Sequence, residues 1–210
     1  QINADLTHPD TEVKLAAVLA PKADSLILSL QNLNIRAPDN RLFRLQDTVN
    51  VSLARQKIEL PRLCLRADDS SGFCATVQQE NSVMTGQGRI ERFPLALLGP
   101  WAEPGPWREA VLAGDWELPG NGEVILRRWS LIHPLGDAQL AGTLGLAEPW
   151  PADLSLTLSY REPQQKISLK TRGSLRQLKA TLTAAGHLRG KGELKGDVLS
   201  QELQVEASLA

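Results

Sequence analysis

Long apolar runs are missing from this sequence, and no stretch approaches the ~20 apolar residues that a membrane-spanning helix needs. An excess of one charge is missing too, because 23 Lys and Arg stand against 24 Asp and Glu, and the formal net charge is −1. We therefore expect no nucleic acid as a partner and no long-range attraction to an anionic membrane. No signal peptide is recognisable, the chain starts at Gln1 without a methionine, and it stops within an apparent strand at Ala210. We expect a segment of a longer protein.

Motifs of enzymes and metal sites are also scarce. The three histidines, His8, His133 and His187, are far apart and lack the spacing of metal ligands. No P-loop, dinucleotide fingerprint or G-x-S-x-G occurs. Asp68 and Asp69 form a carboxylate pair, but a turn explains both residues. We expect no enzyme, no metal and no cofactor.

What the sequence has in abundance is alternation of apolar and polar residues, one strand after another. Successive side chains of a strand point to opposite faces of the sheet, so alternation predicts one wet and one apolar face. Thirteen prolines and sixteen glycines separate these short runs, which is typical of an all-β chain. We predict an elongated, curled, mainly antiparallel sheet. The clearest apolar sets are Leu154, Leu156, Leu158 and Tyr160; Leu178, Ala180, Leu182 and Ala184; Leu188, Gly190, Gly192, Leu194, Gly196 and Val198; and Leu203, Val205, Ala207 and Leu209.

Cys64 and Cys74 flank the turn-rich segment DDSSG. A hairpin centred on Asp69 places the two cysteines directly opposite each other, which is close enough for a disulfide. Leu63 and Leu65 would then lie on the apolar face and the cystine on the other face. A disulfide indicates an oxidising compartment, either the periplasm or the extracellular space. The alternative is a pair of reduced thiols in a cytosolic sheet.

The expected organisation is a single elongated unit over residues 1–210. Residues 1–92 are N-terminal strands that include the Cys hairpin, and residues 113–210 are repetitive strands. Between them, residues 93–112 contain four prolines and two tryptophans, and PLALL predicts a short helix with Pro94 in its first turn. So short a helix is not stable alone, so we expect it to pack on the rest of the protein. It could cap one opening of the sheet or form a packed surface loop.

The apolar face needs a cover, because each fully buried aliphatic side chain contributes ~1.5–3 kcal/mol. A second sheet, curling of the sheet over itself and a bound apolar ligand are the three possibilities. Many positions of this face are small, including Ala138, Gly142, Ala180 and Gly192, which leaves volume for acyl chains. An ordinary sandwich or barrel remains the alternative. In a groove, we expect the lining to be Leu140, Leu144, Leu154, Leu156, Leu158, Leu169, Leu178, Leu182, Leu194, Leu203 and Val205.

Three stretches, RLCLRADDSSGFCATVQ, RFPLALLGPWAEP and GDWELPGNGE, resemble the central part of the TamB family. This family comprises inner-membrane-anchored subunits of translocation and assembly modules and falls in the AsmA-like group. The later segment GSLRQLKATLTAAGHLRGKGELKGDV is similar to the β repeats of the family, a weaker signal than the Cys hairpin and the helix after it. The residues at matching positions are Cys64, Cys74, Pro94, Leu95, Leu98 and Trp101.

The resemblance implies a periplasmic β-taco, which is a half-open trough lined by apolar side chains. It implies phospholipid transport between the two membranes of a diderm bacterium, with a phospholipid or another acyl-chain ligand as partner. The alternative that it implies is assistance to outer-membrane protein assembly with an Omp85-type partner, which other parts of the parent chain would contact. A structural spacer with a filled core is a third possibility. Arg189, Lys191 and Lys195 predict a solvated outer stripe that protects a sheet edge.

Overall fold

A computed structural model describes residues 2–8, 11–22, 24–36, 40–98, 109–197, 200 and 202–209. These residues form sixteen strands and one four-residue 3-10 helix, and every strand pair of known register is antiparallel. The prediction of an all-β, antiparallel fold is confirmed. The chain divides into two compact units, unit 1 at residues 1–113 and unit 2 at residues 114–210. No helix among the described residues is long and apolar enough to cross a membrane.

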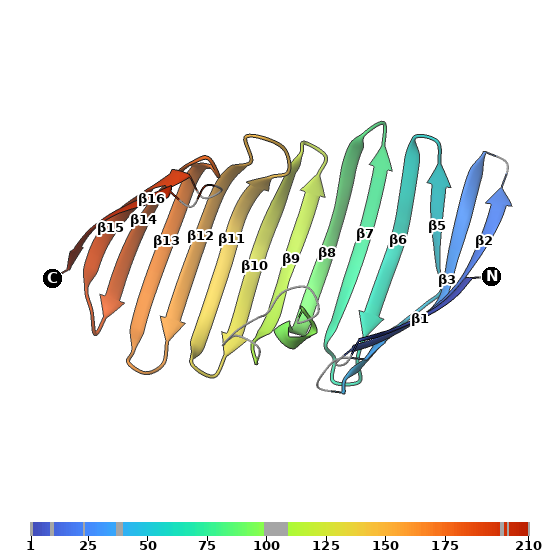
Figure 1. Ribbon diagram of the computed structural model, residues 1–210, viewed down its shortest axis with the longest axis horizontal. Coiled ribbons are helices and arrows are strands. Elements are labelled where there is room, and N and C mark those ends of the chain that lie inside the picture. The colour runs from blue at the N-terminus through green and yellow to red at the C-terminus, as the bar shows by residue number, and fades with distance from the viewer. Residues whose placement is uncertain are drawn as a thin grey trace. The chain divides into compact units, whose positions relative to one another are not determined.

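Unit 1 is a sheet with the strand order β1-β2-β3-β4-β6-β7-β8 (Figure 1). The short strand β5 lies outside this order and, like β4, pairs with both β3 and β6. One face, which we call the inner face of unit 1, carries the apolar members of the alternating pattern, such as Leu28 opposite Val51 and Leu63 opposite Ala75. The elements are β1 (Ile2–His8), β2 (Thr11–Lys22), β3 (Ser25–Arg36), β4 (Leu42–Leu45), β5 (Val49–Ala54), β6 (Lys57–Arg66), β7 (Gly72–Glu80), β8 (Val83–Pro94) and the 3-10 helix η1 (Leu95–Leu98).

Unit 1 curls strongly at one end. Phe43 of β4 and Phe93 of β8 have ring centroids 6.1 Å apart, although three strand spacings separate β4 from β8 in the sheet. Three spacings of a flat sheet would amount to ~14 Å. The sheet therefore bends toward this face between β4 and β8, where Phe43 is buried to 2% exposure and Leu65 to 9%. Side chains packed around this core are Leu33, Ile35, Leu45, Leu63, Ala67 and Phe93.

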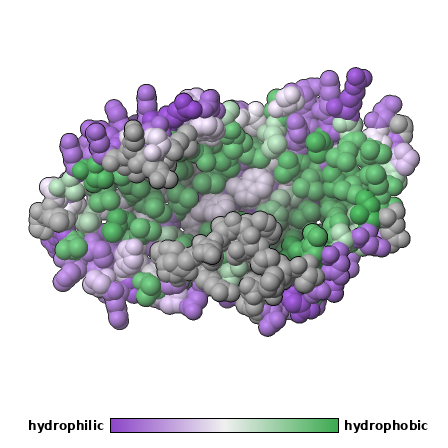
Figure 2. Space-filling view, in the orientation of Figure 1, coloured by the Kyte–Doolittle hydropathy of each residue, from purple (hydrophilic) through white to green (hydrophobic). Residues whose placement is uncertain are grey.

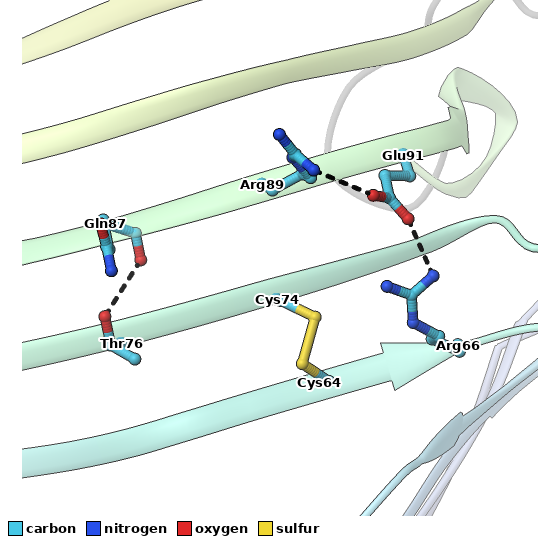
Figure 3. Close-up of a disulfide and its surroundings, with 7 residues drawn as sticks. All are labelled: Cys64, Arg66, Cys74, Thr76, Gln87, Arg89 and Glu91. Carbon is cyan, nitrogen blue, oxygen red and sulfur yellow. Dashed lines mark hydrogen bonds and ion pairs between the residues drawn. A yellow bond between two sulfur atoms is a disulfide. The ribbon is translucent and has the colours of Figure 1, made fainter.

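The Cys hairpin has the predicted register. Cys64 of β6 lies directly opposite Cys74 of β7 and forms a disulfide with it (Figure 3). Leu63 and Leu65 face Ala75 and Phe73, so the cystine lies on the other face of the sheet. On that face, the Arg66 guanidinium binds the Glu91 carboxylate of β8 at 2.8 Å, beside the disulfide (Figure 3).

Asp68 and Asp69 both lie in the turn of this hairpin, and each carboxylate has a partner there. The backbone N–H and the hydroxyl of Ser71 both donate to Asp69 Oδ1, and Ser71 is fully buried. Arg41 Nη1 lies 3.0 Å from Asp69 Oδ2. The hydrogen bonds from Ser71, followed by the nearby cations Arg41 and Arg92, lower the pKa of Asp69 from its ordinary value. Asp68 binds Arg44 at 3.2 Å, so both carboxylates are turn residues with partners.

Loss of the disulfide should destabilise unit 1. The bridge joins cysteines ten positions apart, and closing so short a loop contributes ~2–3 kcal/mol in the chain-entropy description. We expect a reducing agent to lower the urea midpoint of unfolding of the chain accordingly. The doubly substituted Cys64→Ser/Cys74→Ser protein should unfold at the reduced midpoint whether or not the reductant is present. An unchanged midpoint of the wild-type chain in reductant would contradict this expectation.

The expected short helix follows β8 within unit 1. Pro94 ends β8, and the 3-10 helix over Leu95–Leu98 follows it. The backbone N–H of Leu95 donates to the carbonyl of Ala110 at 2.9 Å, which ties the start of this helix to the residue before β9. Residues 99–108, which include Trp101 and Trp107, lie outside the described residues, so a capping role for residues 93–112 stays a prediction.

Unit 2 is a sheet in which each strand pairs with its neighbours in sequence, from β9 to β16 (Figure 1). Strands of eight to eleven residues alternate with short turns. Lys191 and Lys195 lie within β15, whereas Arg189 precedes it in the turn. The strands are β9 (Val111–Pro119, which begins in the last residues of unit 1), β10 (Glu123–His133), β11 (Gly136–Gly145), β12 (Pro151–Tyr160), β13 (Gln165–Ser174), β14 (Gln177–Gly186), β15 (Gly190–Asp197) and β16 (Glu202–Leu209).

Candidate functional site: the apolar inner face of unit 2

The pairing register brings apolar residues of unit 2 into rows that run across the strands. The most complete row passes from Trp129 to Leu140, Leu156, Leu169 and Leu182, each directly opposite the next. Residues directly opposite each other project from the same face of a sheet. We call this face, from β10 to β16, the inner face of unit 2.

All eleven residues predicted to line a groove occupy inner-face positions. The rows of Leu140, Leu144, Leu154 and Leu158 continue through β13, β14, β15 and β16. Most of the predicted lining residues are half-buried, and Val205 on β16 is 67% exposed. The side chain of Leu203 lies outside the described part of the chain, and its backbone pairs with Gly196. The register therefore brings these residues together on one face, whereas their contact with lipid stays a prediction. The other residues predicted to line the groove are Leu156, Leu169, Leu178, Leu182 and Leu194.

The opposite, outer face of unit 2 carries polar and charged side chains. Asp153, Arg172 and Lys179 lie directly opposite one another in a row that continues to Lys195. Two hollows of about 650 Å³ each lie among long side chains of this face, and one of them is lined by Lys170, Arg172, Lys179, Glu193 and Lys195 among others. The exposed Arg172 and Asp153 are 3.7 Å apart, so their ion pair contributes little. These hollows are gaps between solvated side chains and have no part in the apolar site.

Small residues interrupt the leucines of the inner face, as the sequence indicates. Ala138, Ala180, Gly190, Gly192 and Gly196 all occupy inner-face positions. Gly142 has a further role, because its φ is +139° and a Cβ there would collide with the carbonyl oxygen of Asp153. Gly142 is therefore required by the backbone in addition to leaving space on the face.

Thr171 is a polar residue within the inner face. Its hydroxyl lies 3.2 Å from the Leu154 nitrogen and 3.4 Å from the Leu154 carbonyl oxygen, so it can accept from the first and donate to the second. Thr171 is 9% exposed and its hydroxyl is hydrogen-bonded within the protein. It therefore adds little polar surface to the inner face.

Trp129 is an inner-face residue that sequence reasoning missed. Strict alternation from Val124 would place Arg128 on the inner face, but a bulge between Leu126 and Trp129 shifts the register, and Arg128 has a φ of +51°. The indole lies against Gly114 of β9, where a Cβ would come within 2.6 Å of the ring, and its N–H donates to the Asp115 carbonyl at 2.8 Å. The signal in the sequence is the pair of arginines that interrupts an otherwise alternating strand.

The space-filling view also separates apolar from polar side chains. In Figure 2, hydrophobic side chains gather in the middle of the visible face of each unit, and hydrophilic side chains gather along its margins. Among the described residues, no group of three or more His, Cys, Asp or Glu could hold a metal ion. The described side chains of the inner face offer mainly aliphatic surface, together with the indole of Trp129.

Comparison with known protein families gives one match. Residues 112–210 match the family model described as TamB, N-terminal domain. The match covers unit 2 and its β repeats, and the Cys64–Cys74 hairpin lies outside it. The resemblance placed the chain in the middle of the family's proteins, whereas the matched domain is described as N-terminal. No curated protein and no solved structure matches the chain.

Proposed function

Because residues 112–210 form a TamB-like segment, we propose that this chain is a periplasmic stretch of a lipid-transport protein. Its inner face binds acyl chains, and it takes part in moving phospholipid between the inner and outer membranes. The observation that carries the proposal is the continuous apolar face of unit 2, opposite a polar face on the same strands.

Physical chemistry favours a lipid occupant. The rows of leucine from β11 to β14 are half-buried, so a large part of their apolar surface is free to contact a ligand. Burial of apolar surface stabilises a complex by ~25 cal/mol per Å², and an alkyl chain can bury such surface along its whole length. An acyl chain also needs no hydrogen-bonding partners, and the inner face offers few.

The proposed compartment follows from the disulfide and the family. A Cys64–Cys74 bridge persists in an oxidising environment such as the periplasm. The parent protein would be anchored in the inner membrane, and other parts of the parent chain would contact an Omp85-family outer-membrane protein. Within such an assembly, this segment supplies a length of apolar surface between the membranes.

A second candidate function is a scaffold for outer-membrane protein assembly. The same apolar face could hold the alternating side chains of an unfolded β-barrel precursor, because such a strand has one apolar face of its own. The translocation and assembly role attached to the family favours this candidate, and the two functions share their contact residues.

A photo-crosslinker on the inner face separates the two functions. We expect a benzophenone amino acid at Leu156, in cells, to give adducts with phospholipid, because its ring would lie among acyl chains. The same group at Thr157, the next residue on the outer face, should give none. Adducts at Leu156 with β-barrel precursors alone, identified by mass spectrometry, would replace lipid transport with the scaffold function.

A further inference from the structure

One stretch of unit 2 carries many cations and no acid. Residues 163–192 contain neither Asp nor Glu, although the chain as a whole has a formal net charge of only −1. The stretch comprises β13, β14 and the start of β15. Its positive charge is therefore concentrated on two adjacent strands and part of a third. The cations are Lys166, Lys170, Arg172, Arg176, Lys179, Arg189 and Lys191.

The pairing register places the strand cations of this stretch on the outer face. Lys166, Lys170 and Arg172 alternate with the inner-face residues of β13. Lys179 and Lys191 do the same on β14 and β15, and the other two cations lie in the connecting turns. We call this surface the cationic face and define it by Lys166, Lys170, Arg172, Lys179, Lys191 and Lys195.

Three cations of this face lie directly opposite one another. Arg172 pairs with Lys179, and Lys179 pairs with Lys195. Neighbouring strands are ~4.8 Å apart, and like charges directly opposite each other destabilise a sheet. The nearest acids flank the row, with Asp153 3.7 Å from Arg172 and Glu193 3.1 Å from Lys195. Lys179, in the middle of the row, forms no ion pair with any carboxylate in the described part of the chain.

Protection of a sheet edge does not explain these cations. Lysines often prevent unwanted pairing of edge strands, which is the role that the sequence suggested for Lys191 and Lys195. The structure contradicts that expectation, because β15 pairs with both β14 and β16. Strands β13 and β14 are also paired on both sides. The row of like charges is thus retained at a cost in stability where no edge needs protection.

The cationic face offers donors and little apolar surface. Between the cations, the outer positions of β13 and β14 carry hydroxyls such as those of Ser168, Thr181 and Thr183, and no large apolar side chain. Adsorption to a membrane surface gains strength from buried apolar area in addition to charge, and this face has no apolar anchor for it. A hollow of about 650 Å³ is lined by Lys170, Arg172, Lys179 and Lys195 together with Asp153 and Glu193. An occupant that fits these side chains carries several negative charges and hydrogen-bond acceptors.

We propose that the cationic face binds an acidic segment of a protein partner, whose carboxylates lie among Arg172, Lys179 and Lys195. Alternate side chains of an extended segment are ~7 Å apart, which flexible cations on strands ~5 Å apart can match. The bound carboxylates offset the repulsion within the row, and complementary charge also speeds association. The cationic face lies behind the apolar inner face, so this inference goes beyond lipid binding and does not depend on it.

The test uses a fluorescein-labelled peptide of alternating Glu and Ser, with the same peptide carrying Gln for Glu as reference. Fluorescence anisotropy measures the affinity of the purified chain for each peptide at low ionic strength. We expect the wild-type chain to prefer the acidic peptide by about tenfold, because a few exposed ion pairs together give that ratio. The preference should fall at high salt, which screens exposed charges. Arg172→Gln/Lys179→Gln should reduce it to about twofold or less.

The matched control is Lys22→Gln/Arg55→Gln, which removes two exposed cations of unit 1. It changes the net charge equally and leaves the cationic face intact, so we expect it to keep the wild-type preference. The proposal is overturned if the wild-type chain shows no preference, if Arg172→Gln/Lys179→Gln keeps the preference, or if the control loses it to the same extent. Binding to phosphatidylglycerol vesicles without any preference for the acidic peptide would replace the protein partner with an anionic membrane surface.

The repulsion within the row has its own measurement. Lys179→Gln removes the middle cation and leaves Arg172 and Lys195 two strand spacings apart. We expect its urea midpoint of unfolding to equal or exceed that of the wild-type chain. A lower midpoint would contradict the charge repulsion from which the binding of an acidic segment is inferred.

Discussion

If the inner face of unit 2 binds phospholipid as proposed, substitution Leu182→Asp should remove most of the lipid that is recovered with the purified chain. Leu182 lies at the centre of the inner face, between Leu169 on one side and Gly192 on the other. An aspartate there stays hydrated in the empty protein and loses water when an acyl chain covers it, at a cost of several kcal/mol. Since 1.4 kcal/mol corresponds to tenfold in affinity, we expect at least a ~10-fold loss of bound lipid. Native mass spectrometry with lipid extraction measures it.

The neighbouring residue provides the control. Thr183 is exposed on the outer face of the same strand, opposite Ser168 and Lys191, so Thr183→Asp adds the same charge behind the sheet. This variant should retain as much lipid as the wild-type chain. Circular dichroism and a thermal melt establish that both variants are folded. Equal lipid in both variants would show that acyl chains do not contact the inner face of unit 2.

Substitution Phe43→Ala should produce the largest loss of stability of any single change in unit 1. Phe43 is 2% exposed, and its ring packs against Phe93 from a strand that is not its neighbour in the sheet. Truncation of a buried phenylalanine leaves a cavity and typically costs ~3–5 kcal/mol. Because the contact also closes the curl of unit 1, we expect earlier urea unfolding and faster hydrogen exchange in β4 and β8.

Phe73 is a suitable comparison. It lies on β7, opposite Leu65 and Ile90, and is only half-buried. Phe73→Ala removes the same atoms from a less enclosed site, so we expect a loss of ~1–3 kcal/mol and little change in the exchange of β4. If the two substitutions had equal effects, the Phe43–Phe93 contact would not be what closes the sheet.

The Cys hairpin and the strands after residue 150 could be predicted in detail because their information is local. A period of two fixes which face each side chain occupies, and the polar segment around Asp69 fixes the hairpin register. The sequence thus predicted Cys64 opposite Cys74, as well as the common face of residues such as Leu156, Leu169 and Leu182. The family match agrees with the resemblance seen in the repeats, since it covers residues 112–210.

Other features depend on contacts that no local pattern records. The bulge at Arg127 and Arg128 moves Trp129 to the inner face, because backbone geometry there replaces strict alternation. The Phe43–Phe93 contact requires the sheet to bend across three strand spacings, which depends on the twist of every strand between them. The turns that contain Leu135, Arg161 and His187 are likewise distant in sequence and become adjacent only when the strands pair. The sequence by itself therefore determined the two faces of each strand, and the tertiary structure decided how those faces curl and which turns become adjacent.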